Sequence, residues 1–301
     1  MYINQVEAFV NVVRYKSFSQ AARKLYLSQP TISAHIKSLE SELGVQLLVR
    51  TTKDVILSDA GKIFYEYALE LIHIRDVACI KMKSYTKEVK GNLRLAASTV
   101  PAHYILPRLL TGVRKSNPDI FFTVREMDSQ AVISCVENFE VDLGLTGMSV
   151  TDSRLAFTPF LTDRLVLITP NTAAFRHMDG AFPIEHLTKY PYIWRETGSG
   201  TRKVAAAFLH SVGIEESDLN IVTEMQTTES IKQAVYGNLG LSIISRKAVE
   251  DYVKFGHLLE FDFDSELLDR NMYLVYHKSM MFSPTTDYFF NYIKNRYHIE
   301  S

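Results

Sequence analysis

The chain has 301 residues, enough for two or three domains that each bury a hydrophobic core. Its hydrophobic content of 47% and charged content of 22% are typical of a soluble globular protein and exclude a disordered or fibrous chain. No apolar run approaches the roughly 20 residues that cross a bilayer, and the first residues do not resemble a signal peptide. We therefore expect a cytoplasmic protein without membrane contact.

The net charge of −1 is unevenly distributed along the chain. Residues 1–90 contain 13 Lys and Arg against 9 Asp and Glu, whereas residues 91–301 contain 20 against 25. A basic N-terminal part joined to an acidic body is the pattern of a small DNA-binding module attached to a domain that does not bind DNA. The two cysteines, Cys79 and Cys135, match no metal or redox spacing and predict buried reduced thiols.

Residues 3–43 predict three helices that share a small core. The first helix is amphipathic, and the second, around Ala21 and Ala22, carries small residues that let another helix cross closely. The third begins with Ser28 as its N-cap and Pro30 in its first turn, where the missing N–H of proline costs nothing. The positions expected to face inward are Ile3, Val6, Phe9, Val10, Val13, Leu25, Ile32, Ile36, Leu39 and Leu43.

This arrangement turns Gln29, Ser33 and Lys37 outward as a polar stripe on the third helix. A polar-faced helix held at a fixed angle by a short helix and a tight turn suits insertion into a DNA major groove. An ordinary helical hairpin would show the same pattern, so the stripe alone leaves both interpretations open.

A short β-hairpin, or wing, is predicted after Gly44, because Val, Thr and Ile are enriched on both sides of the charged tip at residues 52–54. Arg50 and Lys53 on this wing are placed to reach phosphates or a minor groove beside the third helix. For each of them, a solvated surface cation is the alternative interpretation.

A long helix is predicted from Asp59, with apolar residues recurring every three or four positions over about 25 residues. Such a spacing indicates a coiled-coil seam, and therefore a dimer that suits two-fold related DNA half-sites. The alternative is that the helix packs only on its own chain. The seam residues are Ala60, Phe64, Tyr67, Leu71, Ile74, Ala78, Met82 and Tyr85.

The segment from Phe9 to Gly61, which includes SFSQAAR, SQPTIS and LSDAG, resembles the LysR-type transcriptional regulators. The resemblance implies DNA contacts from Gln29, Pro30, Thr31, Ser33 and Lys37 on the recognition helix and from Arg50 on the wing. Many members carry arginine where this chain has Ala34 and glutamine where it has His35. We include His35 and Lys53 as candidate DNA contacts, but the base preference of a typical member does not transfer.

Residues 91–301 alternate strands with helices, and this rhythm predicts a mostly parallel sheet covered by helices. A second set of strands follows the first, and a late strand at 270–276 is placed to return to it. The expected strands are 93–98, 121–127, 141–146, 165–169, 192–195, 221–225, 241–245 and 270–276, and the expected helices are 101–117, 129–138, a helix from Thr201, a helix from Thr228, and 285–297.

The resemblance implies an α+β multidomain protein with a winged helix-turn-helix at 1–58 and a linker helix at 59–90. The rest, 91–301, would be a two-lobed α/β effector domain similar to periplasmic binding proteins, with the ligand between its lobes. Lobe I is expected at 91–162 and 267–301, and lobe II at 163–266.

Hydroxyl side chains follow several predicted strand ends, which is where ligands gather in α/β domains. Ser or Thr at a helix start is by itself usually a cap, but several such positions at the same edge of a sheet, flanked by glycines, favour a small oxyanion or carboxylate. Arg202 would either neutralise this anion or pair with Glu196. The candidate effector-binding residues are Ser98, Thr99, Thr146, Thr197, Ser199, Thr201 and Thr227.

Relatives that regulate sulfur assimilation have a cleft lined by Thr and Ser, so the resemblance also suggests a sulfate-like or sulfur-metabolite effector. The sequence contains no G-x-S-x-G, P-loop or H-E-x-x-H motif, and its nine histidines are scattered. We therefore expect no catalytic residue, no metal and no cofactor. A free solute-binding protein would account for the body but not for residues 1–90.

The prediction is thus a regulator that binds double-stranded DNA sequence-specifically as a homodimer or homotetramer. A small, anionic effector bound between two lobes would control it.

Overall fold

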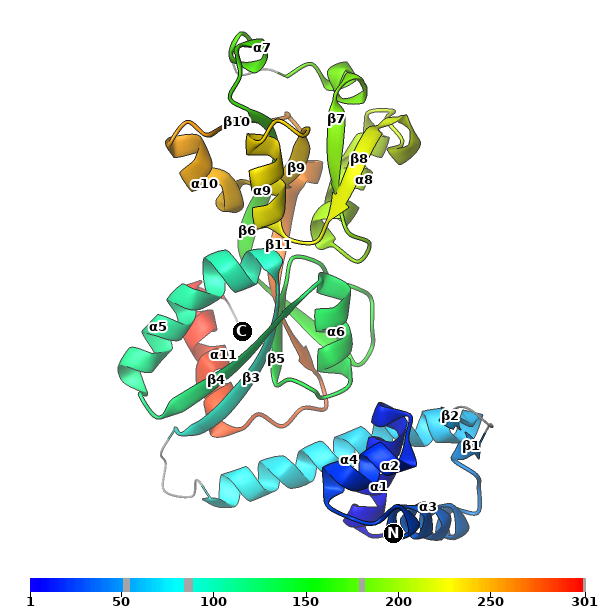
Figure 1. Cartoon of the computed structure of the whole chain (residues 1–301). Helices are drawn as coiled ribbons and strands as arrows, with labels where there is room; N and C mark the ends of the chain where they lie inside the picture. Colours follow the sequence, from blue (N-terminus) through cyan, green and yellow to red (C-terminus); the bar gives the residue numbers. More distant parts are fainter. Residues whose placement is uncertain (51–54, 84–88, 179–181, 300–301) are drawn as a thin grey trace. The chain divides into compact units, whose positions relative to one another are not determined.

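A computed structural model describes residues 1–50, 55–83, 89–178 and 182–299. The chain divides into two compact units (Figure 1). One contains residues 1–88 and 279–283, and the other contains residues 89–278 and 284–301. Within the described ranges, none of the helices has the length and apolar content needed to cross a membrane.

Three helices form the core of the N-terminal unit: α1 (Ile3–Tyr15), α2 (Phe18–Leu25) and α3 (Gln29–Leu43). Most side chains that were expected to face inward are buried, and the helix-turn-helix is confirmed. Ile3 and Leu43 are exposed instead, because they are the first residue of α1 and the last of α3 and lie beyond the region where the helices cross. The buried apolar residues of the three helices are Val6, Ala8, Phe9, Val10, Val12, Ala21, Ala22, Ile32, Ile36 and Leu39.

The turn between α2 and α3 is fixed by local hydrogen bonds. Tyr26 ends α2 in the left-handed conformation, with φ of 56°, which reverses the chain direction within a few residues. The Ser28 hydroxyl accepts a hydrogen bond from the backbone N–H of Thr31 at 3.2 Å, as an N-cap does, and Pro30 occupies the first turn. These contacts set the angle at which α3 leaves the turn.

The wing consists of β1 (Leu48–Arg50) and β2 (Val55–Leu57), paired antiparallel. One carboxylate oxygen of Glu40 on α3 accepts hydrogen bonds from the backbone N–H groups of Leu47 and Leu48, at 2.8 and 3.1 Å. The wing is therefore attached to α3 through a side chain of that helix. The predicted tip at residues 52–54 lies outside the described residues.

The long helix α4 (Asp59–Lys83) has one buried and one exposed apolar face. Ala68, Leu69 and Val77 are buried within the unit. Four predicted seam residues are exposed: Ala78, and also Tyr67 at 60%, Ile74 at 43% and Met82 at 69% of their surface. Ile63 on the same helix is 63% exposed. Cys79 is also exposed on this helix, contrary to expectation, whereas Cys135 is buried. Tyr85 lies outside the described residues.

In the second unit, lobe I begins with three parallel strands, β3 (Gly91–Ser98), β4 (Ile120–Met127) and β5 (Leu143–Thr146). The helical segments between them are η1 (Pro101–Ile105), α5 (Leu106–Ser116) and α6 (Ser129–Glu137), so the predicted alternation is present. The last helix of the chain, α11 (Pro284–Arg296), belongs to the same unit (Figure 1).

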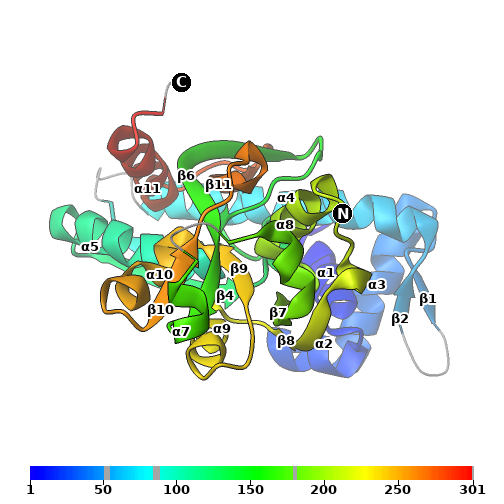
Figure 2. The same cartoon turned by 90° about the horizontal axis from the view of Figure 1, so that it is seen from above.

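Two long strands join lobe I to lobe II, and they correct the expectation of a mostly parallel sheet. β6 (Leu155–Pro170) and β11 (Asp269–His277) pair antiparallel. The strand order is β10-β6-β11-β5-β3-β4, where β10 is Leu258–Phe261, and β9 (Ser242–Ser245) also pairs with β6. The chain enters lobe II along β6 and returns along β11, so the two strands must run in opposite directions. Both run between the lobes in Figure 1, and Figure 2 shows the same two strands from above.

Lobe II contains the parallel pair β7 (Pro191–Arg195) and β8 (Asn220–Met225) and the strands that pair with β6. Helix α10 and strand β10 were not predicted. The remaining elements of this lobe are β9 (Ser242–Ser245), β10 (Leu258–Phe261), α7 (Ala173–Arg176), η2 (Ile184–Lys189), α8 (Gly200–Ser211), η3 (Glu216–Asp218), α9 (Thr228–Tyr236), α10 (Arg246–Lys254) and η4 (Glu266–Leu268).

Candidate functional site

The outer face of α3 carries the predicted DNA contacts. Gln29, Pro30 and Lys37 are exposed, and Thr31 and Ser33 are half-buried. The hydroxyl of Ser19 on α2 donates to the Gln29 side-chain oxygen at 3.0 Å, and this bond orients the amide. Ser28 and Thr31 share a hydroxyl–hydroxyl bond of 2.7 Å in the cap.

The remaining candidates for DNA contact are placed differently. His35 is half-buried, and its Nδ1 is buried without a hydrogen-bond partner among the described residues. The imidazole ring of His35 is therefore turned partly toward the core. Less of this side chain is exposed on the outer face than of the Lys37 side chain. Arg50 is the last residue of β1, and Lys53 lies outside the described residues.

Four predicted hydroxyl residues come together between the two lobes. Ser98 and Thr99 follow β3, and Ser199 and Thr201 lie at the start of α8. With two arginines that were not predicted, they line a small space of about 10 Å³, the inner cavity. That volume holds about one water molecule.

Arg195, the last residue of β7, is one of these arginines, and only 4% of its side chain is exposed. Its guanidinium donates to both carboxylate oxygens of Glu196, at 2.8 and 2.9 Å, and to the backbone oxygen of Gln226 at 3.0 Å. Nη2 also reaches the Thr99 hydroxyl of lobe I at 3.5 Å. Arg195 is thus held at the junction between the lobes.

Arg270 on β11 is the second arginine of the inner cavity. Nε and Nη2 donate to the same carboxylate oxygen of Asp163, at 3.1 and 2.9 Å, and Nη1 donates to the Thr201 hydroxyl at 3.0 Å. Burial lowers the pKa of Arg270 and the nearby charge of Arg195 lowers it further, although Asp163 opposes both. Two buried guanidinium groups therefore face one small space.

The lobes approach closely at two glycines, Gly198 in the loop before α8 and Gly200, the first residue of α8. Gly198 has φ of +96°, and a Cβ added there would lie 2.9 Å from a carboxylate oxygen of Asp128. A Cβ added to Gly200 would lie 3.1 Å from the Ser129 hydroxyl and 3.2 Å from the backbone oxygen of Gly147. Larger residues at either position would separate the lobes, so the glycines permit the closed arrangement.

A wider space of about 530 Å³, the outer cavity, adjoins the inner one and is lined by Thr99 and Thr197. Four carboxylates also line it: those of Glu126, Asp128, Glu196 and Glu224. Asp128 and Glu196 line the inner cavity as well, and two of the four carboxylates are paired with arginine: Glu196 with Arg195 and Glu224 with Arg202. The inner cavity differs from the outer one in being lined by Arg195 and Arg270, whose positive charges favour an anionic group there.

The structure also places Thr146, Thr227 and Arg202. Thr146 is fully buried and accepts a hydrogen bond from the backbone N–H of Met148 at 3.3 Å. Thr227 lines the outer cavity and is the N-cap of α9, as Ser199 is the N-cap of α8. Arg202 does not pair with Glu196, and it does not line the inner cavity; it pairs with Glu216 and Glu224.

The signal that sequence reasoning missed is a charged residue within an apolar strand. Arg195 ends the predicted strand at 192–195, and Arg270 opens the one at 270–276, each beside residues that are buried in the structure. A buried charge needs a partner, and the partner of Arg270, Asp163, lies far away in the sequence. Among the described residues, no group of three or more His, Cys, Asp or Glu side chains is arranged to hold a metal ion.

Comparison with known proteins covers both units. Residues 3–62 match the family model "Bacterial regulatory helix-turn-helix protein, lysR family", and residues 86–297 match "LysR substrate binding domain". The uncharacterised HTH-type transcriptional regulator YeiE of Escherichia coli K12 is 30% identical over 290 residues, which is 96% of each chain.

Two solved structures are similar. The regulatory domain of CcmR from Synechocystis PCC6803, in complex with 2-PG, is 26% identical with a TM-score of 0.63, over 69% of this chain and 98% of that one. A full-length OxyR variant from Pseudomonas aeruginosa has a TM-score of 0.75 over 100% of this chain and 96% of that one; at 17% identity it is a likeness of fold.

Proposed function

We propose the following roles for the two units of this chain, which belongs to the LysR family of transcriptional regulators. As a member of that family it is a DNA-binding transcriptional regulator with an effector-binding domain, and the family is not one of enzymes. The proposals concern the DNA contacts, the oligomer interface and the chemical class of the effector.

The DNA contact that we propose is insertion of α3 into the major groove. The observation that carries it is the outward stripe of Gln29, Ser33 and Lys37 opposite a buried apolar face. Pro30, Thr31 and His35 line the edge of this face, and Arg50 and Lys53 of the wing contact phosphates or the minor groove.

Lys37→Ala should weaken binding to all DNA sequences and reduce the slope of log affinity against log salt by about 0.9, the value for one lost phosphate contact. The measurement is fluorescence anisotropy at several salt concentrations, on an operator selected from random oligonucleotides. Lys62→Ala, at an exposed residue of α4, serves as the control and should change neither quantity. A full salt slope in Lys37→Ala would remove this residue from the phosphate contacts.

We propose that α4 holds the oligomer together, whether a dimer or a tetramer. The exposed apolar side chains of Ile63, Tyr67, Ile74 and Met82 recur along one helix, and their exposure in a single chain is costly unless a second copy covers them. Ile74→Glu should therefore reduce the mass of the oligomer in sedimentation equilibrium, since a buried charge opposes the contact. Glu66→Lys, at a polar position of the same helix, is the control.

For the effector we propose a small oxyanion or carboxylate whose charged group occupies the inner cavity. Its hydrogen bonds would come from Ser98, Thr99, Ser199 and Thr201, whereas Thr197 contacts the part of the effector in the outer cavity. The single observation that carries this is the convergence of four hydroxyls and two guanidinium groups on one space. A sulfate-like ion or sulfur metabolite belongs to this class.

Two further features bear on this proposal. The 2-PG complex of the similar CcmR domain supports a small-molecule effector for a domain of this kind. The carboxylates of the outer cavity imply that the rest of the effector is neutral or positively charged. Because the inner cavity holds only about one water molecule, the lobes must separate to admit the effector. Switching then derives from unequal effector affinity for the two arrangements, which would reposition the DNA-binding units in the oligomer.

Thr99→Val keeps the side-chain shape and removes the hydroxyl that faces Arg195. We expect sulfate to bind the variant about tenfold or more weakly, because a hydrogen bond to a charged group contributes about 1.5–3 kcal/mol. The measurement is calorimetric titration of the full-length chain with sodium sulfate at constant ionic strength. Thr111→Val, at an exposed residue of α5, is the matched control. Equal affinities in the wild type and Thr99→Val would move the anion away from this cavity.

A further inference from the structure

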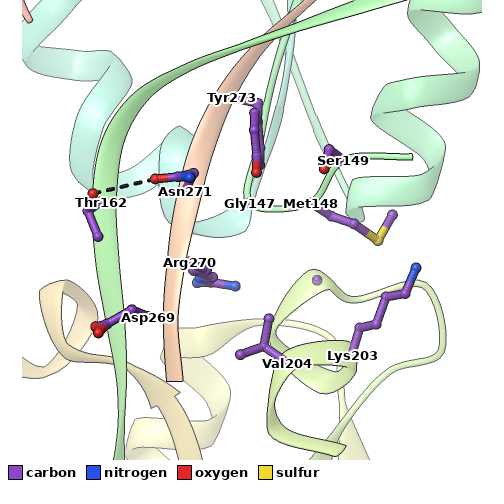
Figure 3. Close-up of a pocket in the computed structure, with 11 residues that line it drawn as sticks. Gly147, Met148, Ser149, Thr162, Lys203, Val204, Asp269, Arg270, Asn271 and Tyr273 are labelled. Carbon is purple, nitrogen blue, oxygen red and sulfur yellow. Dashed lines mark hydrogen bonds between the residues drawn. The ribbon is translucent and has the colours of Figure 1, made fainter. Parts of the chain in front are cut away.

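A third cavity, of about 360 Å³, lies beside the strands that connect the two lobes (Figure 3). We call it the hinge pocket; the side chains that matter are Met148, Ser149, Lys203, Val204, Asn271 and Tyr273. Ser149 and Met148 follow β5 of lobe I, Lys203 and Val204 belong to α8 of lobe II, and Asn271 and Tyr273 lie on β11. The predicted effector residues do not line it.

The charge of the hinge pocket comes from Lys203. Its side chain is exposed, and its ammonium group has no ion pair or hydrogen bond within the described part of the chain. The carboxylate of Asp269, which also lines the pocket, is paired with Arg164 at 2.9 Å, and Arg270 is paired with Asp163. Lys203 therefore supplies an uncompensated positive charge, which favours an anionic group.

The other walls are both polar and apolar. The side-chain oxygen of Asn271 accepts from the Thr162 hydroxyl at 3.4 Å, which leaves the amide N–H groups to donate to an occupant. The Tyr273 ring lies edge-on to Phe157, with 6.1 Å between centroids, so its position is fixed. Met148 and Val204 add an apolar surface on opposite sides (Figure 3).

We propose that the hinge pocket is a second ligand site, which binds a small organic carboxylate. The carboxylate group lies at Lys203 and Asn271, a hydroxyl of the ligand meets Ser149 or Tyr273, and a short carbon chain packs against Met148 and Val204. A bare inorganic anion fits the hinge pocket less well than an organic carboxylate does. It would fill little of the volume and would leave the apolar walls uncovered.

An occupant of this site would act on the lobes as well as bind. Its walls come from lobe I, lobe II and a connecting strand, so a ligand stabilises the arrangement in which those walls are together. Gly147, Gly200 and Arg270 line both the hinge pocket and the inner cavity. Through this shared wall each ligand changes the affinity of the other by the same factor.

The experiment is calorimetric titration of the full-length chain with 3-hydroxybutyrate, which carries the carboxylate, hydroxyl and short chain. The wild type and Thr99→Val should both bind it, because Thr99 lies in the inner cavity. Lys203→Met should bind about tenfold more weakly, as should the wild type with the neutral analogue 3-hydroxybutyramide. Sulfate should show the opposite pattern, with Thr99→Val impaired and Lys203→Met unaffected.

Three results would overturn the second site: no binding of 3-hydroxybutyrate up to about 10 mM, undiminished binding in Lys203→Met together with equal affinity for the amide, or loss of binding in Thr99→Val. The last would place the probe in the inner cavity. The sulfate titrations decide the proposed effector cavity separately, so either conclusion can fail without the other.

Discussion

Asp163→Ala is expected to destabilise the effector-binding domain by about 3–5 kcal/mol, because it leaves the guanidinium of Arg270 buried without its counter-charge. The carboxylate is fully buried, and it accepts two hydrogen bonds from Arg270 and one of 2.8 Å from the Ser245 hydroxyl. After the substitution only the Thr201 hydroxyl, among the described partners, remains to accept from Arg270. The loss should therefore exceed that of an ordinary surface ion pair.

Urea unfolding measures this effect, and the single tryptophan, Trp194, is a buried reporter in lobe II. Asp262→Ala is the matched control: its carboxylate is exposed and pairs with Arg164 and Arg246, so a loss below about 1 kcal/mol is expected. The double variant Asp163→Leu with Arg270→Met should recover much of the stability, since apolar residues can replace a buried ion pair. A loss in Asp163→Ala no larger than in the control would show that Arg270 finds another acceptor.

The DNA-binding unit was largely predictable because its signals are local. Ser28 and Pro30 define the start of α3 within one turn, and the spacing of Ile32, Ile36 and Leu39 defines its buried face. Helix ends are less certain for the same reason: Leu43 continues the spacing, but the helices that cross α3 do not reach it. Periodicity records which face is apolar, and not how far a neighbouring helix extends.

The inner cavity was predictable only in part. Ser98, Thr99, Ser199 and Thr201 follow strand ends, and the carboxyl edge of a sheet brings such residues together. Thr146 has the same local pattern, yet its hydroxyl is used within a turn. A single sequence cannot separate a hydroxyl that caps the backbone from one that faces a ligand, because both occupy the same kind of position.

Arg270 was missed because its charged partner is distant in the sequence. Arg270 and Asp163 are separated by 107 positions and meet only because β6 and β11 pair antiparallel. β6 was also predicted too short, since the first part of the strand lacks the continuous burial of the part after Leu165. Because β6 runs through both lobes, its two parts have different surroundings. Neither the alternating pattern of a half-buried strand nor the continuous apolar pattern of a buried strand describes its whole length.

The second large effect concerns a contact between the lobes at Lys232 on α9. The Lys232 side chain is only 6% exposed, and its ammonium group lies 2.7 Å from a Glu229 carboxylate oxygen. It also lies 4.5 Å from the ring centroid of Tyr252 in lobe II and 5.6 Å from that of Tyr104 in lobe I. The cation therefore links the lobes in the arrangement where the inner cavity is nearly closed.

The charges of this contact persist through the neutral pH range. Burial alone would lower the pKa of Lys232, but its bonds to Glu229 and Tyr104 raise it above the ordinary value, so its contribution is lost only at strongly alkaline pH. Burial would raise the pKa of Glu229, but bonds from Lys232 and Tyr252 lower it, so that contribution is lost only in acid. Measurements near pH 7 thus address the intact contact.

Lys232→Met keeps a long unbranched side chain and removes the charge. The closed arrangement has room for only about one water molecule. Under our proposal that the inner cavity takes the anion, sulfate must therefore bind after the lobes separate, and the rarity of the open state reduces its apparent affinity. A cation–π contact contributes about 0.5–2 kcal/mol, so Lys232→Met should raise the sulfate affinity about 2- to 30-fold. Calorimetric titration measures the change.

Lys254→Met, at an exposed residue of α10, is the matched control and should leave the sulfate affinity unchanged. Hydrogen exchange supplies a second readout, since opening should expose the amides of η1 and the first turn of α9 while leaving those of β3 protected. Faster exchange with weaker sulfate binding would mean that the closed arrangement itself holds the anion. In that case Lys232 would stabilise the effector-bound state, and the direction of the switch would be reversed.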